Sequence, residues 1–180
     1  MNERLELTLK DRLILANQHE ILAAICKDYH EVNHHKTASI VFKKGYEDLY
    51  EKYVDISDVF TEEESDEVIT ILNLYRDLIN SFIKAKEKTG TEMKGEEVYF
   101  PGFDHNDPKE ARMCDFAKFY CKNEADYHVL NKYVKDRRTW NSHGSKTIDD
   151  YKRMNEKARS MSYLSDGYFS IEQIREILKA

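Results

Sequence analysis

Apolar side chains recur at helical spacing along most of this chain, and most clearly between Thr61 and Gly90. Thr61 followed three residues later by Glu64 forms a capping box, in which each side chain satisfies an otherwise unpaired backbone amide. Lysines and then Gly90 give the opposite, C-terminal signal. The pattern therefore predicts a long amphipathic helix with one buried face, made by Val68, Ile71, Leu72, Tyr75, Leu78, Ile79 and Phe82.

Two further helices are predicted before Thr61. The first covers residues 8–27, and its apolar residues at helical spacing predict one broad buried face, made by Ile14, Leu15, Ile21, Leu22 and Ile25. The second covers residues 37–54 with Gly45 inside it, and its predicted buried residues are Ile40, Val41, Tyr46, Leu49, Tyr50 and Tyr53. Between them, the polar residues 30–35 predict a connection or a frayed helix start.

The second half of the chain alternates helices with irregular segments. Residues 98–103 are aromatic and run into Pro101, which predicts a short strand or a buried loop. Asp107 with Pro108 behind it begins a helix that runs to about residue 123, with an extension to 133 left open. Residues 136–147 suggest an exposed loop. Helices follow over about 147–161 and after Ser170, the last one carrying Ile171, Ile174, Ile177 and Leu178.

These elements predict an all-α protein, a single compact domain over residues 1–180 with five to seven helices and a short extended segment near 98–103. Only 8 of the 180 residues are Gly or Pro, which argues against turn-rich β-sandwiches. The net charge of −6 argues against non-specific coating of DNA. No apolar run approaches the length of a membrane helix, so no membrane partner is expected. Three cysteines form no disulfide framework, and we expect reduced thiols in a cytoplasmic protein without a cofactor.

Charge is unevenly distributed along the chain. Residues 47–66 hold nine acids and one lysine, whereas residues 132–159 hold nine bases and four acids. This asymmetry suits either head-to-tail pairing of copies or solvated helix faces. Twelve tyrosines and eight phenylalanines exceed what one small helical core usually needs, which predicts a homo-oligomer that buries aromatic surface between subunits.

Several short segments, in their order, resemble the YfbU family of uncharacterised prokaryotic proteins. They are Arg12–Gln18, Gly45-Tyr46, the helix around Tyr75, Gly102-Phe103-Asp104 before Glu110-Ala111-Arg112, Tyr151–Met154 and Ile171–Ile174. The resemblance runs from about residue 9 to residue 180, and the connections 30–36 and 84–97 depart from it. It implies an all-helical cytoplasmic protein with no established activity, and it transfers no catalytic residue. Some family members carry a helix-turn-helix segment, so the resemblance also suggests a regulatory role.

The first candidate site lies at a predicted helix entrance and comprises Asp104, His105, Asp107, Glu110 and Arg112. Carboxylates, an imidazole and a guanidinium together could bind an anion or a metal, or perform acid/base chemistry. The alternative is structural: Asp107 caps the helix, Glu110 completes the box, and Arg112 pairs with Asp104. That alternative explains His105 least.

The second candidate site is basic and aromatic. Cations interleaved with aromatic residues suit phosphates and stacked bases, and the stretch offers Lys135, Arg137, Arg138 and Trp140, with Lys132, Tyr133 and His143 nearby. In the structural alternative, Trp140 closes the edge of the core and the bases stay solvated.

Three other sets are weaker. Cys114, Cys121 and His128 share a heptad spacing, but on one unbroken helix they lie about 10 Å apart, too far to share one zinc ion. His30, His34 and His35 could scavenge a metal from a polar loop. Arg12, Asn17 and Gln18 could read base edges, although they sit on a long helix that more readily makes helix contacts.

We therefore predict a non-enzymatic binding or regulatory module that self-associates, with a protein partner as one option. Two alternatives stay open: a metal-dependent hydrolase or nuclease-like enzyme using the 104–112 segment, and a nucleic-acid-associated regulator using the basic 132–159 region. The sequence contains no glycine-rich phosphate loop, no dinucleotide fingerprint and no His-Glu-x-x-His.

Overall fold

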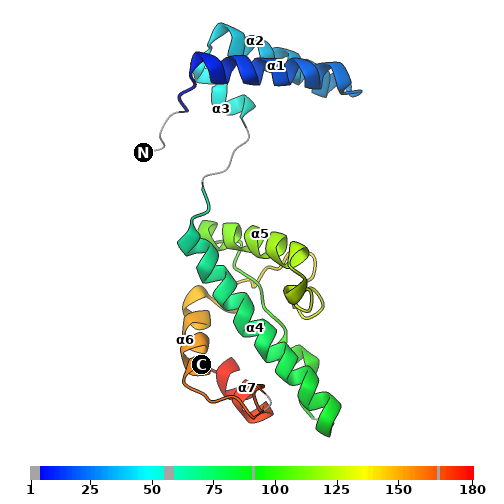
Figure 1. The fold of residues 1–180 in the computed structure, drawn as a ribbon, viewed down its shortest axis with the longest axis vertical. Coiled ribbons are helices and arrows are strands. Elements are labelled where there is room, and N and C mark those ends of the chain that lie inside the picture. The colour runs from blue at the N-terminus through cyan, green and yellow to red at the C-terminus, as the bar shows by residue number, and fades with distance from the viewer. Residues whose placement is uncertain (1–4, 55–58, 91, 166) are drawn as a thin grey trace. The chain divides into compact units, whose positions relative to one another are not determined.

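The computed structural model describes residues 5–54, 59–90, 92–165 and 167–180. Within these ranges it contains seven α-helices, three short 3-10 helices and two isolated β-bridges, and no β-strand (Figure 1). The predicted all-α class is therefore confirmed. None of the described helices is long and apolar enough to cross a membrane.

The chain forms two compact units, an N-terminal unit (Met1–Val59) and a C-terminal unit (Phe60–Ala180). Each has its own cluster of buried hydrophobic residues. The expectation of a single domain over residues 1–180 stays a prediction, and each unit is described by itself below.

The N-terminal unit is a pair of helices, α1 (Leu9–Ile25) and α2 (Tyr29–Lys44), followed by a 3-10 turn (Glu47–Leu49) and the short α3 (Tyr50–Tyr53). α1 begins at a capping box formed by Thr8 and Asp11. α2 begins at Asp28, whose carboxylate accepts hydrogen bonds from the amides of His30 and Glu31.

Of the two alternatives for residues 30–35, the structure shows a helix start: these residues form the first two turns of α2, because Asp28 caps the helix there. The helix therefore begins before the predicted residue 37, and the prediction for Gly45 was wrong. Gly45 does not lie inside a helix: it ends α2 in a left-handed conformation, with a φ of 72°.

The predicted buried face of α1 was wrong as well. The buried residues of α1 are Ala16 and His19, whereas Ile14, Ile21 and Ile25 are exposed. Small side chains let two helices approach closely, and α1 meets α2 through Ala16 and Ala38 rather than through its isoleucines. Of the other residues predicted to be buried in this unit, Val41 and Tyr50 are buried, Leu15 and Tyr53 are partly buried, and Leu22, Ile40, Tyr46 and Leu49 are exposed.

The C-terminal unit is organised around α4 (Glu62–Thr89), against which α5 (Pro108–Asn123), α6 (Ile148–Arg159) and α7 (Ile171–Leu178) pack (Figure 1). The capping box at Thr61 and the end at Gly90 are as predicted. All seven residues predicted for the buried face of α4 are buried. Thr147 and Ser170 cap α6 and α7 in the same way, so the helix boundaries follow from local signals.

Residues 98–103 cross this unit as a buried extended segment that follows a 3-10 turn (Gly95–Val98). The amide of Phe100 donates to the carbonyl of Tyr133 at 2.7 Å, and the amide of Phe103 donates to that of Trp140 at 2.9 Å. Together with the two β-bridges, these bonds fix the irregular residues 134–141 against the segment.

The region 136–147 is an irregular loop and most of its residues are exposed, as predicted, but Trp140 and Ser142 within it are buried. The aromatic excess of the chain is largely taken up by the same core, where Tyr75, Phe100, Phe103 and Tyr151 pack at ring-centroid distances of 4.9–6.1 Å. Tyr29, Tyr46, Phe119 and Tyr163 are exposed, and the homo-oligomer stays a prediction.

Candidate anion-binding site

The predicted site over residues 104–112 lies at the start of α5, where its side chains make local contacts. Asp107 caps the helix, accepting from the amides of Lys109 (2.8 Å) and Glu110 (3.0 Å). The buried Glu110 does not complete the box on Asp107: its carboxylate accepts from the amide of Asp104 at 2.8 Å. The Asp104 carboxylate in turn accepts from the amide of Asn106. These acids hold the turn before α5.

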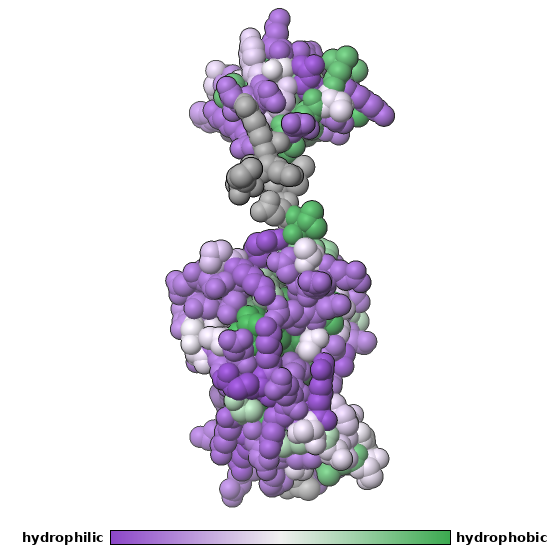
Figure 2. Space-filling model, turned by 90° about the vertical axis from the view of Figure 1, so that its left-hand side faces the viewer, coloured by the Kyte–Doolittle hydropathy of each residue, from purple (hydrophilic) through white to green (hydrophobic). Residues whose placement is uncertain are grey.

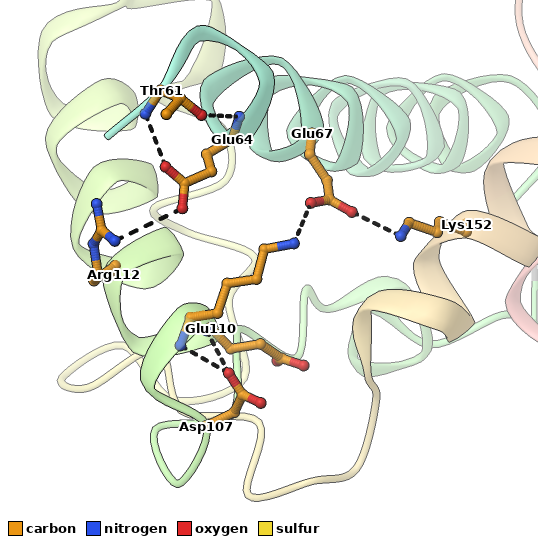
Figure 3. Close-up of polar contacts among 8 residues, drawn as sticks. Thr61, Glu64, Glu67, Asp107, Glu110, Arg112 and Lys152 are labelled. Carbon is orange, nitrogen blue, oxygen red and sulfur yellow. Dashed lines mark hydrogen bonds and ion pairs between the residues drawn. The ribbon is translucent and has the colours of Figure 1, made fainter. Parts of the chain in front are cut away.

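Arg112 joins α5 to the start of α4. Its guanidinium nitrogen lies 3.8 Å from the Glu64 carboxylate, and the group sits 5.6 Å above the Phe60 ring. Arg112 thus pairs with Glu64 (Figure 3). Among the described residues it forms no ion pair with Asp104. The structural alternative for this segment was right about Asp107 but wrong about the partners of Glu110 and Arg112.

Next to this pair, the Glu67 carboxylate bridges two helices by pairing with Lys109 of α5 at 2.9 Å and with Lys152 of α6 at 3.0 Å (Figure 3). Burial disfavours the charged form of Glu67, yet the two ammonium groups hold its pKa below the usual value. The charged groups around the 104–112 segment therefore fasten three helices together.

His105 is exposed, but its ring contacts one buried side chain. Its Nε2 lies 3.2 Å from the Sγ of Cys114, which is buried and also faces the carbonyl of Thr139. Burial raises the pKa of the Cys114 thiol to about 11, which disfavours the nucleophilic thiolate. In the described part of the chain, no group of three or more His, Cys, Asp or Glu side chains is placed to hold a metal ion.

The predicted set of His30, His34 and His35 lies on α2 of the N-terminal unit. The Nδ1 atoms of His19 and His35 lie 2.9 Å apart, and the His34 ring packs against Tyr53. Burial, and then the two neighbouring imidazoles, lower the pKa of His19. The third member of the predicted set, His30, is exposed and lies against Tyr29.

The remaining sequence candidates separate in space. α5 ends at Asn123, so Cys121 lies in the helix and His128 lies beyond it. Asn17 and Gln18 are exposed on α1, while the Arg12 guanidinium lies against Gly45.

By contrast, the fold does bring residues from distant segments together in a basic hollow. It has a volume of about 410 Å³ and lies between α5 and the residues that follow it, lined by Lys118, Lys122, His128, Asn131, Arg137, Arg138 and Trp140. The described residues of this lining include four permanent cations and no carboxylate. Guanidinium and ammonium groups are the side chains that best bind phosphate and carboxylate anions.

The cations of the basic hollow come from two elements. Lys118 and Lys122 stand one helical turn apart on α5, where like charges repel. Arg137 and Arg138 stand on a turn held by Asp136, whose carboxylate accepts from the amides of Arg138 (3.0 Å) and Thr139 (3.2 Å). The side chain of Arg137 also donates to the carbonyl of Lys132 at 2.8 Å. The arginines are thus carried on an ordered backbone.

Trp140 forms the wall of the hollow where it meets the core. It is 4% exposed, has a φ of 58°, and packs at right angles to Phe100 at 5.9 Å. Trp140 therefore closes the edge of the core, as the structural alternative expects, and its ring is too buried for bases to stack on it. Lys135 does not line the hollow, and its amide pairs with the carbonyl of Phe100.

Sequence reasoning identified Arg137, Arg138 and Trp140 but missed Lys118, Lys122 and His128. The available signal was the pair of lysines four residues apart on a predicted helix, which looks like an ordinary solvated face until the fold adds the arginines.

Comparison with known protein families gives one match across almost the whole chain. A family model described as the YfbU domain matches residues 5–180. The match spans described parts of both compact units.

Proposed function

The chain belongs to the YfbU family, and we propose that this member is a non-enzymatic binding module whose basic hollow takes up a phosphate-bearing small molecule. The observation that carries the proposal is the lining itself: two lysines and two arginines converge on one hollow, and no carboxylate stands among its described residues. Gathering like charges raises the free energy of the empty protein, and a bound anion relieves that repulsion.

The size and walls of the hollow support a small ligand over a nucleic-acid strand. A volume of about 410 Å³ falls in the range of small-molecule sites. Strand-binding grooves add exposed aromatic rings on which bases stack, whereas Trp140 is buried. Phosphate recognition without base stacking fits a free phosphate compound best, and a nucleic-acid-associated regulator is the second candidate.

We propose a non-enzymatic protein because the candidate acid/base residues already have structural roles. Asp107, Glu110 and Arg112 are engaged in a cap, a turn and an ion pair, and burial raises the pKa of Cys114 to about 11. We further propose that the protein is cytoplasmic, in keeping with its free cysteines, and that it self-associates.

Trp140, the sole tryptophan of the chain, makes a direct test available because it lines the hollow. Titration of the full-length protein with pyrophosphate and with ADP should change its intrinsic fluorescence with a saturable profile. Arg138→Ala and Lys118→Ala should each weaken binding by about tenfold, the value of one charge-assisted contact. Lys179→Ala, at an exposed lysine outside the hollow, is the matched control and should bind as the unchanged protein does.

Three results would replace the proposal. Absence of any saturable response to either compound would remove the phosphate site. Tighter binding of a single-stranded oligonucleotide, with loss in the same variants, would favour the nucleic-acid candidate. Release of inorganic phosphate that His105→Ala abolishes while the protein stays folded would favour the hydrolase candidate.

A further inference from the structure

We propose that His19 and His35 form a metal site between α1 and α2, which holds one divalent transition-metal ion through the Nδ1 atoms of both imidazoles. The inference goes beyond the proposed function and does not depend on the basic hollow, because both histidines lie in the N-terminal unit.

The two nitrogens are spaced as two ligands of one ion would be. His19 on α1 and His35 on α2 bring their Nδ1 atoms to 2.9 Å where the two helices lie side by side (Figure 1). Around an ion with metal–nitrogen bonds of about 2.0–2.1 Å, two nitrogens at right angles lie about 2.9 Å apart, and two at the tetrahedral angle about 3.3 Å apart. The spacing therefore favours the square-planar or tetragonal geometry of Cu²⁺ and Ni²⁺ over the tetrahedral geometry of Zn²⁺.

The surroundings of His19 fix its ring and leave Nδ1 free to bind an ion. The ring stacks on Phe42 with centroids 5.5 Å apart, and the residue is 9% exposed. Burial lowers the pKa of His19, and a hydrogen bond to the backbone of Tyr53 opposes that shift. A bond that raises the pKa is one that the ring donates, and Nδ1 faces His35, so Nε2 donates it and Nδ1 keeps its lone pair. Metal-ligating histidines usually donate their second nitrogen to a carbonyl in this way.

His35 completes the site from the second turn of α2. Because His19 keeps its lone pair, Nδ1 of His35 carries the proton between the two rings in the metal-free pair. His35 is only partly buried, so its ring can turn toward an ion, and binding moves that proton to its Nε2. The described residues add no third His, Cys, Asp or Glu side chain to the pair, so water fills the remaining coordination positions.

A metal bridge between the two helices would offset the small core of the N-terminal unit. The buried hydrophobic residues of this core are few, and two of them are alanines: Ala16, Ala38, Val41, Phe42 and Tyr50. Hydrophobic side chains are visible on the surface of this unit in Figure 2. Units of this size usually need a partner, a metal or disulfides, and Cys26, as the one cysteine of this unit, forms no disulfide within it.

Isothermal titration calorimetry of the untagged full-length protein with Ni²⁺ tests the site. The unchanged protein should bind one Ni²⁺ per chain. His35→Gln should weaken binding by more than the roughly 10- to 100-fold that loss of an outer hydrogen-bond partner costs, because it removes a ligand itself. His30→Gln is the matched control: the substitution and the helix are the same, but His30 is exposed and lies against Tyr29. It should bind as the unchanged protein does. Absence of binding, or equal binding by His35→Gln, would overturn the site.

Electron paramagnetic resonance identifies the ligands directly. The Cu²⁺-loaded protein should show hyperfine splitting from two coordinated nitrogens, and His35→Gln should lose the contribution of one of them. A spectrum of the unchanged protein with oxygen ligands alone would overturn the proposal, and this result does not depend on how well any variant folds. Helical circular dichroism checks that His35→Gln keeps its helices.

Hydrogen exchange followed by mass spectrometry locates the bridge. A ligand that binds only the folded unit stabilises it, so Ni²⁺ should slow exchange over both α1 and α2 and leave α4 unchanged. Slower exchange over α4 instead would place the ion elsewhere and overturn the inference. The response of Trp140 to phosphate compounds reports on the other unit, so the metal site and the proposed function can fail independently.

Discussion

Replacing Gly102 by alanine should strongly destabilise the C-terminal unit, because two independent constraints meet at this residue. Its φ is 97°, a backbone conformation that residues with a side chain rarely adopt. A Cβ placed there would also collide with the backbone carbonyl of Trp140, and no flexible side chain could move aside to make room.

The magnitude follows from these two terms. Backbone strain of this kind costs about 1–3 kcal/mol. Pushing the Trp140 carbonyl away also breaks its bond with the amide of Phe103, now 2.9 Å, and an unsatisfied buried amide costs about 1–3 kcal/mol. We expect a total loss of about 3 kcal/mol in the free energy of unfolding.

Urea unfolding followed by tryptophan fluorescence measures this loss in the right unit, because Trp140 is the only tryptophan. With a slope near 2 kcal/mol per molar urea, the midpoint should fall by about 1.5 M. Gly90→Ala is the control: its φ of 64° carries strain, but a Cβ there meets nothing within 4 Å, so its midpoint should fall by about 0.5 M. Equal shifts in the two variants would refute the close approach of Gly102 to Trp140.

Three further predictions follow from charged and titratable groups. Glu67→Gln should cost about 1 kcal/mol near neutral pH; because the two lysines hold the pKa of Glu67 below its usual 4.5, the difference from the unchanged chain should persist above that pH and vanish as pH falls through the lowered pKa, which urea midpoints across pH would show. In the native protein Cys114 should react with N-ethylmaleimide far more slowly than the half-buried Cys26, as mass spectrometry of timed samples would reveal; equal rates would contradict the burial that raises the pKa of Cys114 to about 11. Burial lowers the pKa of His19, so folding disfavours its protonation, and the N-terminal unit should lose stability as pH falls below about 6.5; His19→Gln should flatten this dependence in circular-dichroism melts, and an unchanged slope would assign it to other groups.

Local signals predicted the C-terminal unit well. Thr61, Thr147 and Ser170 each begin a helix through a capping box, a contact that spans only three residues and can be identified from sequence. The same logic failed at Asp28, where no apolar run marked the helix behind the cap.

Periodicity could not choose between the two faces of α1. Apolar residues lie on both sides of this helix, and the prediction placed the bulkier set, which includes Ile21, on the buried face. The contact with α2 instead uses Ala16, because close helix packing depends on small side chains and on the partner's shape. Such information is not contained in the spacing of one helix.

Two of the four cations of the basic hollow could be predicted from the sequence. Arg137 and Arg138 stand out as neighbours in sequence, but Lys118 and Lys122 join them only through the folding of the residues between. The 104–112 segment shows the reverse: its charged residues are adjacent in sequence, yet Arg112 pairs with Glu64 of another helix.

The buried segment 98–103 also bears on how the C-terminal unit folds. Its bridges join Phe100 to Val134 and Phe103 to Asn141, pairs more than thirty residues apart. Closing such long loops is entropically expensive and slows folding relative to the formation of α4, whose hydrogen bonds are local. Since the turn carrying Arg137 and Arg138 is docked by these bridges, the arginines should reach their final positions late, once the helices around the segment have assembled. The cationic surface of the hollow is therefore a property of the finished unit, and a nascent or partly folded chain would not present it.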